Sequence, residues 1–239
     1  VALGLFLMPP LFFASYASNN PQRFLGLRKL PTYLSAPHSR KNAAPLPPSY
    51  HTFIALALIT IGCFFAVDLL ARAAQLLPDT GWVHSLREQE QLVNVALSTL
   101  LADMNLTTLA MNFLIMVLVP AFGEELFFRG ILLKLFNRTF DFRKAALLSA
   151  FFFALAHQQP LSFLPIFFMG LTFAYVKMWT GTLWAPILMH AINNGFALGS
   201  AWMNAGVLES TSSIPLFMSI LGLLPFAAGA LWLRYIQRQ

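Results

Sequence analysis

The sequence predicts an all-α protein, a polytopic helix bundle integral to a membrane. Hydrophobic residues make up 58% of the 239 residues and charged residues only 10%, whereas about a quarter of the residues in soluble domains are charged. Apolar runs also recur along the chain, close to the length of about 20 residues that a membrane-spanning helix needs. A single cysteine, Cys63, excludes a disulfide-stabilised scaffold.

Seven apolar runs predict about seven transmembrane helices. They cover residues 1–17, 52–70, 106–128 or beyond, 145–157, 161–178, 182–202 and 214–233. The first run is short and the sequence opens with Val1. We interpret this run as a trimmed span rather than a signal peptide, because no basic residue precedes it.

The charges between these runs predict the orientation of the bundle. Every second connection and the C-terminal tail are basic: Arg23, Arg28, Lys29, Arg40 and Lys41, then Lys134, Arg138, Arg143 and Lys144, then Lys177, and finally Arg234 and Arg238. The positive-inside rule places these connections and the C-terminus in the cytoplasm. The more acidic connection at 75–103 is expected outside, with an amphipathic helix. The basic residues behind the net charge of +6 are thus distributed as the positive-inside rule predicts, and they do not indicate a nucleic-acid partner.

Ionisable residues within the predicted spans are rare. The insertion of each one into a membrane at the centre of a helix costs about 2.5 to 3.5 kcal/mol of free energy. Asp68 and Arg72 stand four residues apart and are expected to pair on one helix face. Glu125 and Arg129 share a face in the same way, whereas Glu124 points about 100° away and lacks that partner. Two adjacent acids inside an apolar run favour a functional site over an interfacial charge cluster.

Two histidines and an asparagine complete the candidate site. His157 ends the fourth run, and His190 and Asn194 lie one turn apart on the sixth. At about 1.5 Å per residue, Glu124, His157 and His190 each lie about 15 to 20 Å from a separate cytoplasmic basic residue: Lys134, Lys144 and Lys177. Independent core histidines would have no reason to share the depth of a carboxylate. We therefore predict one site near the middle of the membrane.

This set of residues predicts the hydrolysis of an amide. Glu124 suits a general base that activates water, with His157 sharing the proton or orienting the water. His190 and Asn194 can donate hydrogen bonds to a developing oxyanion. We predict neither a metal nor another cofactor. A three-ligand zinc site on the same residues is the alternative mechanism, and a non-catalytic membrane scaffold or immunity protein is the alternative function. A proton-relay transporter is disfavoured because the sequence has no internal repeat.

Three short motifs follow one another on successive apolar runs: Glu124-Glu-x-x-x-Arg129, Phe153-x-x-x-His157 and His190-x-x-x-Asn194. In order and spacing they resemble the motifs of the CAAX protease and bacteriocin-processing family, also called the Abi family of intramembrane endopeptidases. The resemblance covers about residues 105–202 and implies a catalytic core of four helices. It implies that Glu124 activates water with His157, that His190 and Asn194 form the oxyanion side, and that Glu125 and Arg129 have supporting roles.

We expect one membrane domain with three parts. Residues 1–104 hold the N-terminal spans with a Pro-rich cytoplasmic loop and the outer loop, residues 105–202 the catalytic core, and residues 203–239 the last span and cytoplasmic tail. The expected partners are membrane lipids and a peptide or protein substrate, such as a prenylated tail or a bacteriocin or pheromone precursor. The compact size favours the inner membrane of a bacterial cell.

Overall fold

The computed structural model describes residues 6–27, 49–101, 105–203 and 214–238, and all regular structure in these ranges is helical. The prediction of an all-α membrane bundle is confirmed. The predicted Pro-rich loop at 31–48 lies outside the described residues. The helix expected in the outer connection is present as α4 (Trp82–Leu101).

Within the described ranges, four helical segments are long and apolar enough to cross a membrane: Tyr50–Gln75, Leu106–Thr139, Phe163–Thr180 and Leu216–Ile236. They correspond to the second, third, fifth and seventh predicted runs. The fourth run forms α8 (Phe142–Ala156), whose 15 residues extend only about 22 Å. The sixth forms α10 (Trp184–Met203), where a histidine and two asparagines lower the hydropathy. The count of seven spans therefore stays a prediction.

Within the first predicted run the structure describes the short helix α1 (Met8–Ala17), which is followed by α2 (Pro21–Leu25). The last run forms two helices, α11 (Leu216–Leu221) and α12 (Leu223–Arg238), rather than one. Gly222 separates them at a close contact, because a Cβ atom there would lie 2.0 Å from Cγ of Phe65.

The third predicted run is a continuous helical segment of 34 residues. Its α-helical parts are α5 (Leu106–Asn112), α6 (Val119–Glu125) and α7 (Leu133–Thr139). Two π-helical parts, η2 (Phe113–Leu118) and η3 (Leu126–Leu132), lie between them. Such wide turns occur often at functional sites. Here they flank α6, the part that carries the two adjacent glutamates.

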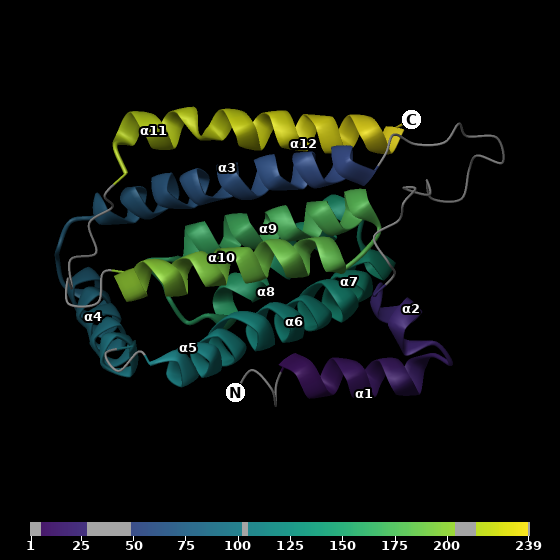
Figure 1. The fold of residues 1–239 in the computed structure, drawn as a ribbon, viewed down its shortest axis with the longest axis horizontal. Coiled ribbons are helices and arrows are strands. Elements are labelled where there is room, and N and C mark those ends of the chain that lie inside the picture. The colour runs from purple at the N-terminus through teal and green to yellow at the C-terminus, as the bar shows by residue number, and fades with distance from the viewer. Residues whose placement is uncertain (1–5, 28–48, 102–104, 204–213, 239) are drawn as a thin grey trace.

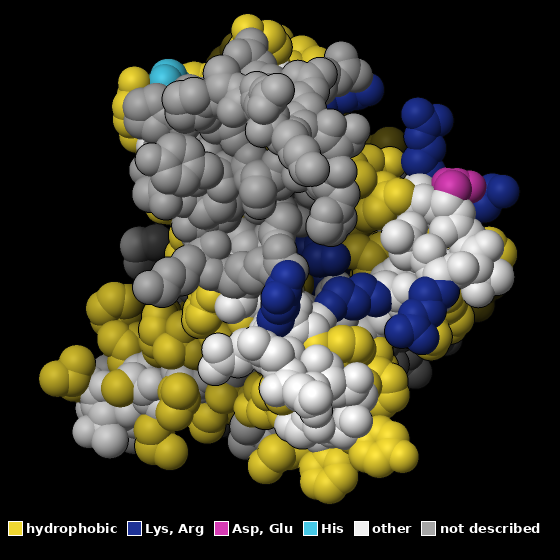
Figure 2. Space-filling view, turned by 90° about the vertical axis from the view of Figure 1, so that its right-hand side faces the viewer, with side chains coloured by type: hydrophobic (Ala, Val, Ile, Leu, Met, Phe, Trp, Pro, Cys, Tyr) yellow, Lys and Arg dark blue, Asp and Glu magenta, His cyan; other side chains and the backbone are white. Residues whose placement is uncertain are grey.

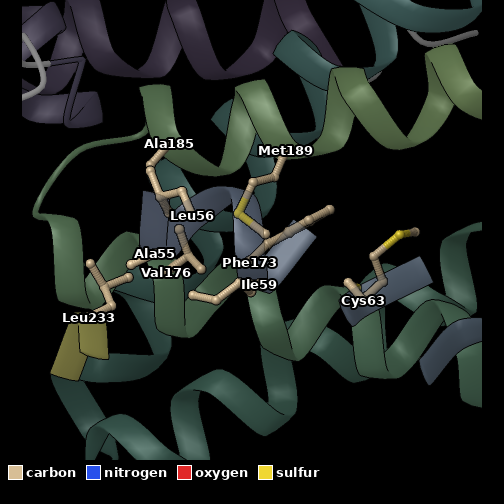
Figure 3. Packing of buried hydrophobic residues seen from close by; sticks show 10 residues of the cluster. Ala55, Leu56, Ile59, Cys63, Phe173, Val176, Ala185, Met189 and Leu233 are labelled. Carbon is tan, nitrogen blue, oxygen red and sulfur yellow. The ribbon is translucent and has the colours of Figure 1, made fainter. Parts of the chain in front are cut away.

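The helices pack as neighbouring layers (Figure 1). The α11–α12 segment lies along one edge of the bundle beside α3 (Ser49–Gln75). Helix α9 (Phe163–Thr180) contacts both α3 and α8, and α10 contacts α9, α6 and η2. A buried apolar cluster joins α3, α9, α10 and α12 (Figure 3), and it includes Leu56, Ile59, Phe173, Met189 and Leu233.

An ion pair at one end of α3 ties this helix to α11. Nε of Arg72 donates to Oδ2 of Asp68 over 2.8 Å, as the spacing of four residues predicted. The hydroxyl of Ser219 donates to the same carboxylate oxygen over 2.6 Å, and Arg72 also donates to the carbonyl of Ile214. This pair is therefore part of a structural clamp away from the candidate site.

Basic side chains gather at the opposite end of the bundle (Figure 2). Lys134 and Arg138 belong to α7, and Arg143 and Lys144 to the first turn of α8. The ammonium of Lys134 lies 4.7 Å from the ring centroid of Phe24 in α2, which holds the N-terminal helices against this end. The cytoplasmic location of the basic end stays a prediction.

Candidate active site

Glu125 and Arg129 form a fully buried ion pair. Nη1 of Arg129 lies 2.7 Å from Oε1 of Glu125, and both side chains have 0% exposure. Nη2 of Arg129 donates to the carbonyl of Gly170 in α9 over 2.8 Å. The guanidinium carbon also lies 4.3 Å from the ring centroid of Phe153. A charge this deep needs such compensation, so Arg129 anchors the long helix to α8 and α9.

His190 extends this network toward the neighbouring glutamate. Its Nδ1 lies 3.1 Å from Oε1 of Glu125, the oxygen that also accepts from Arg129. Since a carboxylate only accepts hydrogen bonds, the proton belongs on Nδ1 of His190. The ring stacks against Phe173 with centroids 5.2 Å apart, which holds it in place. Nε2 consequently points to Glu124, 3.9 Å from Oε2.

His157 lies at the C-terminal end of α8 and is fixed in a similar way. Its Nδ1 lies 2.8 Å from the carbonyl of Phe153, one turn earlier. A backbone carbonyl only accepts, so Nδ1 of His157 is also the protonated nitrogen. Its Nε2 lies 3.7 Å from Oε2 of Glu124. Each of the two imidazole rings thus directs its Nε2 atom toward Oε2 of Glu124.

Glu124 is mostly buried, with 12% of its side chain exposed. Its Oε2 atom makes no hydrogen bond within the described part of the chain. The separations of 3.7 and 3.9 Å from the two Nε2 atoms are too long for direct hydrogen bonds. When both rings are neutral, all three atoms are acceptors, and only a donor between them can satisfy the group. A water molecule would bring two donor hydrogens, one for Oε2 of Glu124 and one for an Nε2 atom.

Asn194 lies one turn beyond His190 on α10 and makes a different contact. Its Nδ2 donates to the carbonyl of Met116 over 3.4 Å. In an α-helix that carbonyl would accept from the N–H of residue 120, which here is a proline and has none. The structure therefore places Asn194 beside the defect in the long helix. No described contact joins Asn194 to Glu124.

Several contributors to this site have no signal in the sequence. Gly170 supplies a carbonyl from an apolar helix that otherwise resembles any other span. A Cβ atom at Gly170 would lie 2.9 Å from Cδ1 of Phe153 and 3.3 Å from Nη2 of Arg129. Phe173 is one of 24 phenylalanines, and only the folded chain shows that it stacks on His190.

A metal-binding arrangement is not evident in the described ranges. No group of three His, Cys, Asp or Glu side chains there has the geometry to hold an ion.

Comparisons with known proteins agree with the motifs. Residues 106–196 match a family model described as type II CAAX prenyl endopeptidase Rce1-like. Over 106 residues the chain is 32% identical to the membrane-embedded CAAX protease MroQ of Staphylococcus aureus strain USA300. That match spans 42% of this chain and 42% of the relative, less than half of either. No solved structure matches this chain.

Proposed function

We propose that this protein is an intramembrane endopeptidase in which Glu124 activates the attacking water, because residues 106–196 match the type II CAAX prenyl endopeptidase family model. One observation carries the proposal: Oε2 of Glu124 lies 3.7 and 3.9 Å from imidazole nitrogens that have no proton of their own when the rings are neutral. A water molecule between these atoms could donate one hydrogen to Glu124 and the other to an imidazole nitrogen, which would polarise it for attack.

The proposed reaction proceeds through a tetrahedral intermediate. The water oxygen attacks the carbonyl carbon of the substrate as its proton moves to Glu124. The carbonyl π bond breaks, and its electron pair moves onto oxygen as an oxyanion. The carbon–nitrogen bond then breaks, and the proton held by Glu124, or shared with His157, moves to the leaving nitrogen. The products are a free carboxyl group and a free amine, and no external reactant besides water is needed.

The oxyanion requires a hydrogen-bond donor, and the geometry limits which group can serve. His190 donates Nδ1–H to Glu125, so it can donate from Nε2 only as an imidazolium. Asn194 uses Nδ2 on Met116, but this nitrogen carries a second hydrogen. We assign the oxyanion to this second hydrogen of Asn194, with His190 beside it as a donor only in its protonated form.

The proposed substrate is a peptide segment presented at the membrane. The relative's name refers to a CAAX protease, and a prenylated C-terminal tail would suit a site inside a lipid bilayer. Bacteriocin leaders and pheromone precursors require the same chemistry. We propose this substrate class together with the surrounding lipids as the partners, and the inner membrane of a bacterial cell as the location.

The decisive experiment compares cells that carry the native protein with cells that carry Glu124→Gln. The amide is nearly the same size as the carboxylate but cannot take a proton. We expect a peptide product that appears only with the native protein, while the variant accumulates to the same level in the membrane. A phenotype that the substitution leaves unchanged would favour the non-catalytic scaffold.

A zinc-dependent reaction on the same residues is tested separately. Metal analysis of the purified protein is combined with activity measured in a strong chelator. We expect activity to survive chelation. Stoichiometric zinc together with complete inhibition by the chelator would replace the glutamate mechanism with a metal-dependent one.

A further inference from the structure

A polar cavity lies beside the connection between α8 and α9, which begins at His157. It has a volume of about 230 Å³ and is lined by the C-terminal end of α3, by α4 and by the residues that precede α9. Its polar walls include Gln75, Arg87, Glu90, Asn94 and Ser162. A water molecule occupies about 30 Å³ in the liquid, so the cavity can hold either several waters or one long side chain.

The unneutralised charge of this cavity is negative. Arg87 is already engaged, because its Nη1 lies 3.1 Å from Oδ1 of Asp79 and its Nη2 donates to the carbonyl of Leu77 over 2.7 Å. Glu90 has no such partner: its Oε1 is buried without a hydrogen bond in the described ranges. Burial raises the pKa of Glu90. A buried carboxylate oxygen without a donor gains most from a cation that carries its own N–H groups.

The cavity lies within reach of a peptide bound at the candidate active site. Leu161 and Ser162 form one of its walls and follow His157 closely in the chain. Four residues span at most about 14 Å, and here the connection is tightened by turns. Gln158 has a left-handed φ of 55°, and the N–H of Ser162 donates to the carbonyl of Gln159 over 3.1 Å. A substrate side chain about four residues or fewer from the cleaved bond can therefore enter the cavity.

We propose that this cavity is a specificity subsite that accepts a lysine or arginine side chain of the substrate, with Glu90 as its counter-ion. The inference rests on the proposed peptidase function, because it takes the ligand to be part of the same peptide. Arg87 lines the subsite but is held by Asp79, and among the described lining residues Glu90 alone has a buried charged oxygen without a hydrogen bond. Gln75 and Asn94 provide further hydrogen-bonding groups for a guanidinium or an ammonium.

The test uses pairs of peptides that differ at one position, where one has lysine and the other norleucine, which lacks the charge. The position is moved through four residues on each side of the cleaved bond. We expect the native protein, reconstituted in lipid, to show about tenfold higher kcat/KM for lysine at one position. Glu90→Gln should make the two peptides nearly equal, and Glu90→Lys should reverse the preference. Glu88→Gln is the matched control, because Glu88 lies on the same helix, is largely exposed and faces His84.

Binding to the Glu124→Gln protein separates this proposal from the proposed function. The same peptides are titrated onto that variant with and without Glu90→Gln, so that no hydrolysis is needed. A lysine preference of several-fold that disappears with Glu90→Gln supports the subsite even if no peptide is hydrolysed, an outcome in which only the proposed function fails. Hydrolysis or binding with the same lysine-to-norleucine ratio in native and Glu90→Gln proteins at every position would overturn the subsite.

Discussion

The side-chain amide of Asn194 donates to the carbonyl of Met116, which lies in the π-helical part η2, four residues before Pro120. Nδ2 of Asn194 lies 3.4 Å from the carbonyl oxygen of Met116, and Pro120 has no N–H to donate to it. A backbone defect in one helix thus orients a polar side chain on another. This relationship links the irregular helix to the proposed oxyanion side of the site.

Pro120→Ala is expected to weaken catalysis without loss of folding. Alanine restores the N–H at residue 120, which then competes with Asn194 for the carbonyl of Met116. Alanine is also more favourable than proline in a helix interior, so the free energy of unfolding should not fall. We expect kcat to decrease about tenfold with little change in KM, since the donor is needed only as the oxyanion forms.

A double-mutant cycle checks the link between the two residues. If Pro120→Ala acts through Asn194, it should lower kcat little further in a protein that already carries Asn194→Ala. Fully additive losses in kcat would contradict the link.

The two adjacent glutamates should respond differently to substitution. Glu124→Gln removes a group that has no ionic partner closer than the two imidazoles, and we expect a folded, inactive protein. Glu125→Ala leaves Arg129 buried without its counter-ion, a loss of about 3 to 5 kcal/mol in soluble proteins. Unfolding in a detergent series, together with product formation, measures both effects. Equal destabilisation by the two substitutions would contradict the separate roles.

The local part of this site could be predicted from the sequence. Helical spacing alone pairs Glu125 with Arg129, and the 2.7 Å ion pair confirms it. The shared depth of Glu124, His157 and His190 also predicted their proximity, and the structure brings the two imidazoles within 3.9 Å of the carboxylate. Both predictions succeed because helix geometry fixes which residues share a face, and because the rise per residue fixes how deep each residue lies in the bilayer.

The tertiary contacts could not be predicted in the same way. The bond from His190 to Glu125 depends on how α10 rotates against α6, and the carbonyl of Gly170 depends on how closely α9 approaches. The two π-helical turns have no periodic signature in an apolar run. These turns change the angular positions of the side chains near Glu124 around the helix axis. A periodicity of 3.6 residues describes those positions only approximately.

Gly170→Ala is expected to disturb the buried ion pair of Glu125 and Arg129, although Gly170 is not a member of that pair. The added methyl group would lie 2.9 Å from the ring of Phe153 and 3.3 Å from Nη2 of Arg129. Overpacking of this kind typically costs about 1 to 3 kcal/mol. We expect lower stability and reduced kcat, because Arg129 also positions Glu125 and through it His190. Gly199→Ala is the matched control, since a Cβ atom there has no neighbour within 4 Å, and it should change neither quantity.

The first turn of α8, the helix that leads to His157, should become less stable at acidic pH. Asp141 caps α8, and its carboxylate accepts from the backbone N–H groups of Arg143 and Lys144. The hydrogen bond from the backbone of Lys144, the largest contribution, lowers the pKa of Asp141. Because the folded pKa is the lower one, this stabilisation is present above the unfolded value of about 3.9 and is lost as the pH falls through the folded value.

Hydrogen exchange at the first turn of α8 measures this effect. Between pH 6 and pH 3, protection of that turn should decrease in the native protein, after correction for the intrinsic pH dependence of exchange. In Asp141→Asn the side chain still caps the helix but no longer titrates there, so the corrected protection should stay nearly constant. In Asp141→Ala it should be low at every pH. The same acid-dependent loss in native and Asp141→Asn proteins would assign the titration to another group.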